Sequence, residues 1–314
     1  MDRRLALRVA ALTAALLAFG AFAPKWLAFL LTMSVTHGLA ILGVVVLNRG
    51  GGATFGQGLF FAIGAYGAAL AEQHLGLSDA VLRVLLGGLS AGLVASLAAP
   101  LLVRYRGIFF AMLTLALSMV AYGILTKASA LGGSDGFNLT KPTLFGHPLD
   151  SAWADYALYA LTIVTAAVAG ALVVAYFRSA AGLLSLAVRA NPLRVEYLGA
   201  STRTSVGVNF TIAGVLGGLG GALTGLALGH VDPNFAYWTT SGEFVFAAVL
   251  AGYQSVLAVF VASIGLEAVR SFSNLYFPNT WQLALGAFLL LVILFRPGGI
   301  GSLWVRRRGA GGVA

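Results

Sequence analysis

Residues 26–47, WLAFLLTMSVTHGLAILGVVVL, decide the fold class of this protein. The segment contains no Asp, Glu, Lys or Arg, and most of its side chains are apolar. An α-helix rises 1.5 Å per residue, so a stretch of roughly 20 apolar residues crosses the hydrocarbon core of a bilayer, which is about 30 Å thick. We therefore predict a membrane-spanning helix here.

The composition of the whole chain extends this prediction. Of the 314 residues, 59% are apolar and only 9% are charged, whereas a soluble protein has roughly 25% charged residues. The chain is therefore predicted to be an all-α, polytopic membrane protein forming a single transmembrane domain over residues 1–314. The net charge of +9 is what basic cytoplasmic loops give a membrane protein. The absence of Cys excludes disulfides, and four scattered His without an HExxH pair give no support for a metal site.

Several other apolar segments are candidate spans. The first of them ends in Ala21-Phe22-Ala23, which resembles a signal-peptide cleavage site. We interpret it as an uncleaved first span, because another long apolar segment begins at Trp26. A polar stretch, predicted to form a periplasmic loop over about 127–153, divides the chain. The further candidate spans cover residues 5–23, 54–71, 81–103, 107–126, 154–177, 206–229 and 281–295.

The apolar run over residues 243–270 decides the number of crossings. If it formed one helix, the basic tail Arg306-Arg307-Arg308 would lie outside the cell, against the positive-inside rule. A break at Gly252-Tyr253-Gln254 gives about ten crossings and places both termini in the cytoplasm. Under this topology most Arg residues lie inside, and all acids except Asp2 and Glu196 lie outside. The segment 240–251 is then about 18 Å long, too short to span alone. Such segments often line the substrate path of transporters.

Glycines organise two parts of the chain. Gly217, Gly221, Gly225 and Gly229 recur every four residues, which predicts close packing of that helix against its neighbours. A pore-lining stripe is the alternative. The clusters at residues 50–52 and 56–58 are dense enough to break or delay a helix.

Few polar residues lie within the predicted spans, and these are candidates for a translocation path. We interpret Glu243 first as a cap at a helix N-terminus, with a path-lining role as the alternative. His37 is interpreted first as a hydrogen-bonded packing residue. No acid is placed deep within a span, which argues against an ion-coupled carrier, and no GxxxxGK[ST] motif for nucleotide binding is present. The path candidates are His37, Gln57, Tyr66, Glu243, Tyr253 and Gln254.

The basic segment 178–205 is the most informative loop. It combines Arg178, Arg189, Arg194 and Arg203 with regularly spaced Leu and Val, which predicts a short amphipathic helix at the cytoplasmic surface. Such a helix could rest on anionic headgroups or bind a cytoplasmic partner.

Several motifs together resemble one family. They lie at residues 52–66 (GATFGQGLFFAIGAY), 106–116 (RGIFFAMLTLA), 132–136 (GGSDG), 179–199, 238–243 (WTTSGE) and 295–300 (FRPGGI). In order and spacing the chain is similar to the inner-membrane permease subunits, of the M type, of branched-chain amino-acid ABC transporters. It departs from the family at Ala251-Gly252-Tyr253-Gln254 and at Asn191-Pro192. Because Pro192 breaks a helix, two short docking segments, 182–190 and 193–199, are expected.

The resemblance implies an importer subunit without an enzymatic site or cofactor of its own. ATP and Mg would be used by two cytoplasmic ATPase subunits. A related second permease would complete the pore, and a periplasmic binding protein would deliver branched-chain or other small amino acids. Importers of urea, amides or nucleosides share this architecture, and an ion-coupled carrier or a membrane enzyme remain alternatives. The residues expected to couple the loop to the ATPases are Gly182, Leu183, Leu186, Arg189, Ala190, Asn191, Arg194, Leu198 and Gly199.

Overall fold

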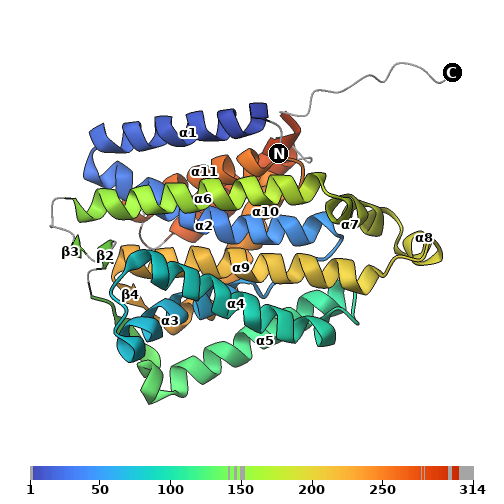
Figure 1. The fold of residues 1–314 in the computed structure, drawn as a ribbon, viewed down its shortest axis with the longest axis horizontal. Coiled ribbons are helices and arrows are strands. Elements are labelled where there is room, and N and C mark those ends of the chain that lie inside the picture. Colours follow the sequence, from blue (N-terminus) through green and yellow to red (C-terminus); the bar gives the residue numbers. More distant parts are fainter. Residues whose placement is uncertain are drawn as a thin grey trace.

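The protein is a bundle of α-helices that lie alongside one another (Figure 1). The computed structural model describes residues 3–140, 142–144, 147–148, 153–276, 278, 280–295 and 299–303. Asp2, Arg296 and Arg306 to Arg308, which entered the topology prediction, lie outside the described residues. The α-helices are α1 (Arg3–Phe22), α2 (Lys25–Arg49), α3 (Gln57–Leu75), α4 (Ala80–Leu102), α5 (Ile108–Lys127), α6 (Ala154–Arg178), α7 (Ala180–Ala190), α8 (Pro192–Tyr197), α9 (Thr202–Leu228), α10 (Trp238–Ala251), α11 (Val256–Tyr276) and α12 (Trp281–Phe295).

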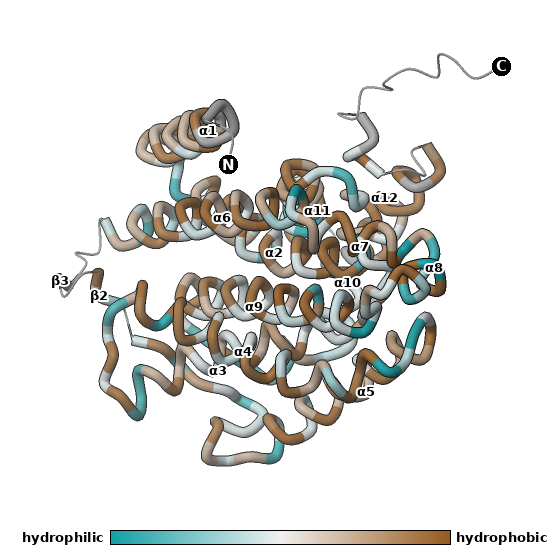
Figure 2. Tube along the Cα trace, turned by 45° about the vertical axis from the view of Figure 1, so that its right-hand side comes forward, coloured by the Kyte–Doolittle hydropathy of each residue, from teal (hydrophilic) through white to brown (hydrophobic). Residues whose placement is uncertain are grey.

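Within the described ranges, six helices are long and apolar enough to cross a membrane, namely α2, α4, α5, α6, α9 and α11. The predicted all-α polytopic membrane fold is confirmed, while the number of crossings stays a prediction. Apolar residues, drawn in brown in Figure 2, make up much of the outer helices. Helix α4 carries an exposed apolar row, formed by Leu85, Leu89, Leu93 and Leu97. An apolar surface of this length is unusual on a protein that faces water. This face is suited to contact with lipid or with another membrane subunit.

Short elements gather at the end of the bundle opposite α7 and α8 (Figure 1). Strand β1 (Phe137–Asn138) pairs antiparallel with β4 (His230–Val231), and β2 (Thr143–Leu144) pairs antiparallel with β3 (His147–Pro148). They lie with the 3-10 turns η1 (Ser129–Leu131), η2 (Gly133–Asp135) and η3 (Pro233–Ala236), whereas η4 (Ile300–Leu303) follows α12.

Helix α9 is the centre of the bundle and packs against α2, α3 and α4. Small residues allow this approach, since a Cβ on Gly221 would overlap the carbonyl of Phe61, and a Cβ on Gly64 would overlap the backbone of Gly218. Helix packing is therefore confirmed for Gly217, Gly221 and Gly225. Gly229 instead follows the end of α9 with φ of 67°, and a Cβ there would meet nothing within 4 Å.

Both predicted helix interruptions are present. Helix α10 ends at Ala251, Gly252 has φ of 73°, and α11 begins at Val256. After α2, the chain is non-helical over residues 50–56, and α3 begins only at Gln57.

Most of the described arginines lie at the end of the bundle that carries α7 and α8. Arg189 contacts Asn48 and Tyr253, while Arg106 pairs with Glu196 of α8. The opposite end carries Lys25, which lies 4.0 Å from Asp155, and the short strands. The charges are therefore distributed asymmetrically between the two ends of the bundle.

Candidate functional site

Two helices begin inside the bundle and meet there. The backbone N–H of Gly58, at the start of α3, donates to Ser241 Oγ of α10 at 2.9 Å. The depth of this meeting point is fixed by Gln57, which bonds to the carbonyl of Ala213 near the middle of α9. Non-helical backbone at this depth is tolerated only inside protein or along a wet cavity. Discontinuous helices of this kind form substrate sites in transporters.

The side chain of Gln57 is fully buried at this point. Its Nε2 donates to the Ala213 carbonyl at 3.0 Å, but its Oε1 accepts no hydrogen bond from any described residue. A buried amide oxygen without a donor costs free energy. The fold therefore leaves one polar atom of Gln57 without a hydrogen bond among the described residues.

An ionic network lies beside this meeting point. His37 Nδ1 is 3.2 Å from Glu267 Oε2, and Glu267 is 3.6 Å from Arg270 Nη1. Arg270 also forms an ion pair with Glu243 of α10. His37 lies about 18 Å along α2 from Arg49, which places the network near the middle of a bilayer roughly 30 Å thick. All four side chains are mostly buried.

This network corrects two predictions. Glu243 does not cap a helix, because α10 begins at Trp238 and the residue lies in the second turn, beyond the free N–H groups. The expectation that no acid lies deep within a span is also wrong, because Glu243 and Glu267 belong to α10 and α11 and their side chains are mostly buried. His37 is a packing residue between Phe61 and Phe244, as predicted, yet it also contacts a carboxylate.

Sequence reasoning missed Glu267 and Arg270. Their i, i+3 spacing within an otherwise apolar run was the available signal, since two opposite charges three residues apart share one helix face. It also missed Arg83, which is 0% exposed and lies 2.5 Å from Glu72. The other oxygen of Glu72 accepts from the backbone of Thr140 at 3.0 Å, so this pair ties α3 and α4 to the loop beyond β1.

The remaining path candidates lie elsewhere. Tyr66 packs against Phe137 near β1, and among the described residues its buried hydroxyl has no partner. Gln254 lines a groove between α2, α6 and α11, and Tyr253 lies beneath Arg189. The structure therefore joins His37 and Glu243 in one network, places Gln57 beside it, and places Tyr66, Tyr253 and Gln254 elsewhere.

The predicted coupling segment forms two helices. Ser179 caps α7 by accepting from the N–H of Gly182, and Asn191 has an extended backbone and caps α8 by accepting from Arg194 at 2.9 Å. Pro192 occupies the first turn of α8, where its missing N–H costs nothing. A Cβ on Gly182 would overlap the carbonyl of Tyr176, and Gly199, with φ of 84°, ends the segment. The break at Asn191-Pro192 is thus confirmed.

This segment presents apolar side chains to the outside. Tyr197 is 91% exposed and Leu198 is 80% exposed, and Leu183 and Leu193 are also exposed. Leu186 is half-buried, and Ala190 and Arg194 are exposed. Exposed apolar side chains at the tip of a short helical loop are typical of a surface that a protein partner covers.

One carboxylate fixes the loop to the bundle. Glu196 accepts hydrogen bonds from the Thr202 hydroxyl and, at 3.2 Å, from Arg106. The Thr202 hydrogen bond first, and the positive charges of Arg106 and Arg203 second, hold the pKa of Glu196 below its ordinary value. Glu196 therefore links α8 to α9 and to the start of α5.

Comparison with known proteins identifies the family. Residues 26–294 match the family described as the permease component of branched-chain amino acid transport systems. The chain belongs to this family. It is 27% identical over 292 residues to the high-affinity branched-chain amino acid transport system permease protein LivM of Escherichia coli (strain K12), covering 86% of this chain and 68% of that protein. LivM of Salmonella typhimurium (strain LT2) gives the same values. No solved structure matches.

Membership in the permease family confirms the resemblance that the motifs indicated. It also makes the chain a transport component. The roles of individual residues in the path and in the coupling loop stay predictions, because the family match concerns the chain as a whole.

Proposed function

We propose that this chain is the transmembrane permease subunit of an ATP-binding-cassette importer for branched-chain or other small amino acids. The α7–α8 loop carries the proposal, because it projects from one end of the bundle with Leu183, Leu193, Tyr197 and Leu198 exposed (Figure 1). A permease that is driven by separate ATPase subunits needs an exposed surface to which those subunits bind. Two cytoplasmic ATPase subunits, which use ATP and Mg, would dock on it, and this chain needs no cofactor of its own.

The charge distribution supports an orientation. The α7–α8 end carries Arg49, Arg189 and Arg194 and would face the cytoplasm by the positive-inside rule. The single transmembrane domain would then have about ten crossings in the bacterial inner membrane, with both termini cytoplasmic. A reporter fused after Arg308 tests this topology, and a periplasmic signal would refute it.

The substrate path would pass the meeting point of α3 and α10. ATP-driven closure of the ATPases would move the α7–α8 loop and rock the helices between inward-facing and outward-facing states. Such a shift requires that ATP bind the two states differently. A related second permease would form the other wall of the path, and a periplasmic binding protein would deliver the substrate.

Reconstitution tests the proposal. The chain is purified with the second permease and the ATPases, placed in proteoliposomes, and supplied with binding protein and labelled leucine. We expect uptake that requires ATP and stops when any subunit is omitted. Labelled urea, an amide and a nucleoside are compared in the same vesicles, because the same architecture can import these solutes.

An ion-coupled secondary carrier is the second candidate. The observation that favours it is the ionic network at mid-membrane, since Glu267 is the kind of acid that such carriers use. The vesicles distinguish the two mechanisms. Uptake by this chain alone, driven by a proton or sodium gradient without ATPases, would exclude the importer.

A further inference from the structure

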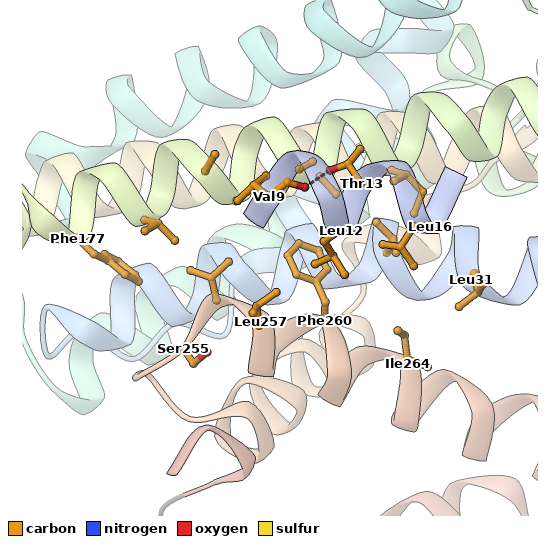
Figure 3. Close-up of a pocket in the computed structure, with 18 of the residues that line it drawn as sticks. Val9, Leu12, Thr13, Leu16, Leu31, Phe177, Ser255, Leu257, Phe260 and Ile264 are labelled. Atoms are coloured by element: carbon orange, nitrogen blue, oxygen red, sulfur yellow. Dashed lines mark hydrogen bonds between the residues drawn. The ribbon is translucent and has the colours of Figure 1, made fainter. Parts of the chain in front are cut away.

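An apolar groove runs along the bundle between α1, α2, α6 and α11. Helix α1 packs on α6 and α11 packs on α2, which leaves an elongated cavity of about 530 Å³ between the two pairs. Its sides are formed by Leu12, Leu16, Val35, Ile163, Val174 and Phe260. Figure 3 shows these helices contributing side chains to the same space, with Leu12, Leu16 and Phe260 near its middle.

The groove is long in the direction of the helices. Its lining residues on α6 run from Tyr159 to Arg178, a distance of about 28 Å at 1.5 Å per residue. This exceeds the roughly 15 Å of hydrocarbon in one leaflet of a bilayer. The groove therefore has room for one extended acyl chain, and its walls are as apolar as the lipid interior.

The end of the groove near α7 is basic. Arg49 and Arg178 line it, and Gln254 and Ser255 lie beside them. The guanidinium of Arg49 stacks over the ring of Phe177 at 4.2 Å, and its Nε is buried and bonds to no described residue. Among the described lining residues there is no Asp or Glu. An anion at this end would therefore meet the guanidinium of Arg49, whose Nε bonds to no described residue.

We propose that this groove binds one acyl chain of an anionic phospholipid, with the phosphate held by Arg49. Basic pockets between membrane helices on the cytoplasmic side are suited to anionic headgroups. Arg is also the side chain best matched to phosphate, because it can donate two parallel hydrogen bonds. A bound lipid would contact both α1 and α11. It would also restrain α11, the helix that carries Glu267.

Lipid retention in the intact transporter complex tests the proposal. The complex is placed in nanodiscs of phosphatidylglycerol and phosphatidylcholine, extracted into detergent, and analysed by native mass spectrometry. We expect the wild type to retain phosphatidylglycerol in preference to phosphatidylcholine. The Arg49→Gln variant should reduce that retention about tenfold, because it removes the charged donor that holds the phosphate. Arg104→Gln is the matched control, since Arg104 is exposed and does not line the groove.

A second variant blocks the groove without changing charge. Ala171→Phe places a ring into the cavity, whereas Val168→Phe places the same ring on the exposed face of α6. Ala171→Phe should lose the retained lipid and Val168→Phe should keep it. If the arginine variant does not fold, this pair of variants decides the outcome.

Three results would overturn the proposal. One is equal retention of both lipids by the wild type, and another is unchanged phosphatidylglycerol retention in Ala171→Phe. The third concerns the rival occupant, a helix of the second permease. A photo-crosslinker at Leu257, which lines the groove, should react with lipid, and crosslinking to the second permease instead would assign the groove to the subunit interface.

Discussion

The guanidinium of Arg189 lies 3.7 Å from the centre of the Tyr253 ring. Arg189 belongs to α7 and Tyr253 to the turn between α10 and α11, so the coupling segment touches the break in the helix pair directly. Arg189 also donates to the carbonyl of Asn48, near the end of α2, at 3.3 Å. Arg189 was predicted to couple the loop to the ATPases, and Tyr253 was predicted to line the translocation path. The structure therefore brings a coupling candidate and a path candidate into contact.

Replacing Tyr253 with Ala should weaken coupling between ATP hydrolysis and uptake. A cation–π contact at a partly exposed site contributes roughly 0.5–1 kcal/mol. We therefore expect about a two- to fivefold loss of ATP-dependent uptake in proteoliposomes, with the subunits still co-purifying. Tyr253→Phe keeps the ring and should keep uptake near the wild-type level. Equal losses in both variants would show that the hydroxyl, not the stacking, is required.

Replacing Arg270 with Gln should destabilise the permease. Glu243 and Glu267 would then lie in the membrane interior without the cation that both contact. Removing one partner of a buried ion pair costs roughly 3–5 kcal/mol, and partial exposure of this one makes that figure an upper bound. Each kcal/mol lowers the melting temperature by roughly 2–4 °C in a domain of 150–250 residues, and by less in a longer chain. Thermal unfolding of the purified chain in detergent measures the change.

The double variant Glu243→Gln/Arg270→Gln separates charge balance from packing. It removes one negative and one positive charge together, so it should recover part of the stability lost in Arg270→Gln. If the double variant lost as much stability as Glu243→Gln and Arg270→Gln lose together, the result would contradict the ion pair.

The spans could be predicted because hydropathy is a local property of the chain. Residues 26–47 are apolar whatever surrounds them, and α2 covers them. The break at Gly252 could also be predicted, since the positive-inside rule required an additional crossing in this segment. In the structure Gly252 has a positive φ, which favours glycine.

The ionic network could not be predicted because its contacts join distant parts of the sequence. His37 and Glu267 are separated by 230 positions. No periodicity in α2 indicates which residue of α11 faces it. Glu243 was interpreted as a helix cap because the start of α10 could not be placed to within one turn, and one turn separates a free N–H from a bonded one.

Replacing Gly64 with Ala should disrupt the centre of the bundle. A Cβ at this position would overlap the backbone of Gly218 in α9, and backbone atoms cannot rotate away as a side chain can. Overpacking typically costs roughly 1–3 kcal/mol, and a clash with backbone belongs at the upper end. Gly123→Ala in α5 is the matched control, because a Cβ there meets nothing within 4 Å. The yield of folded protein after size-exclusion chromatography should fall for Gly64→Ala only.

Removing the hydroxyl of Thr202 should raise the pKa of Glu196. In the folded chain the Thr202 hydrogen bond lowers this pKa, so the ionised carboxylate stabilises the α8–α9 contact. The contribution is present above the ordinary pKa of Glu, about 4.3, and is lost as the pH falls through the lower folded value. Thr202→Val should move the titration of the ¹³C-labelled carboxylate upward towards the ordinary value. Thr204→Val, whose hydroxyl bonds to Ser201 instead, should leave it unchanged.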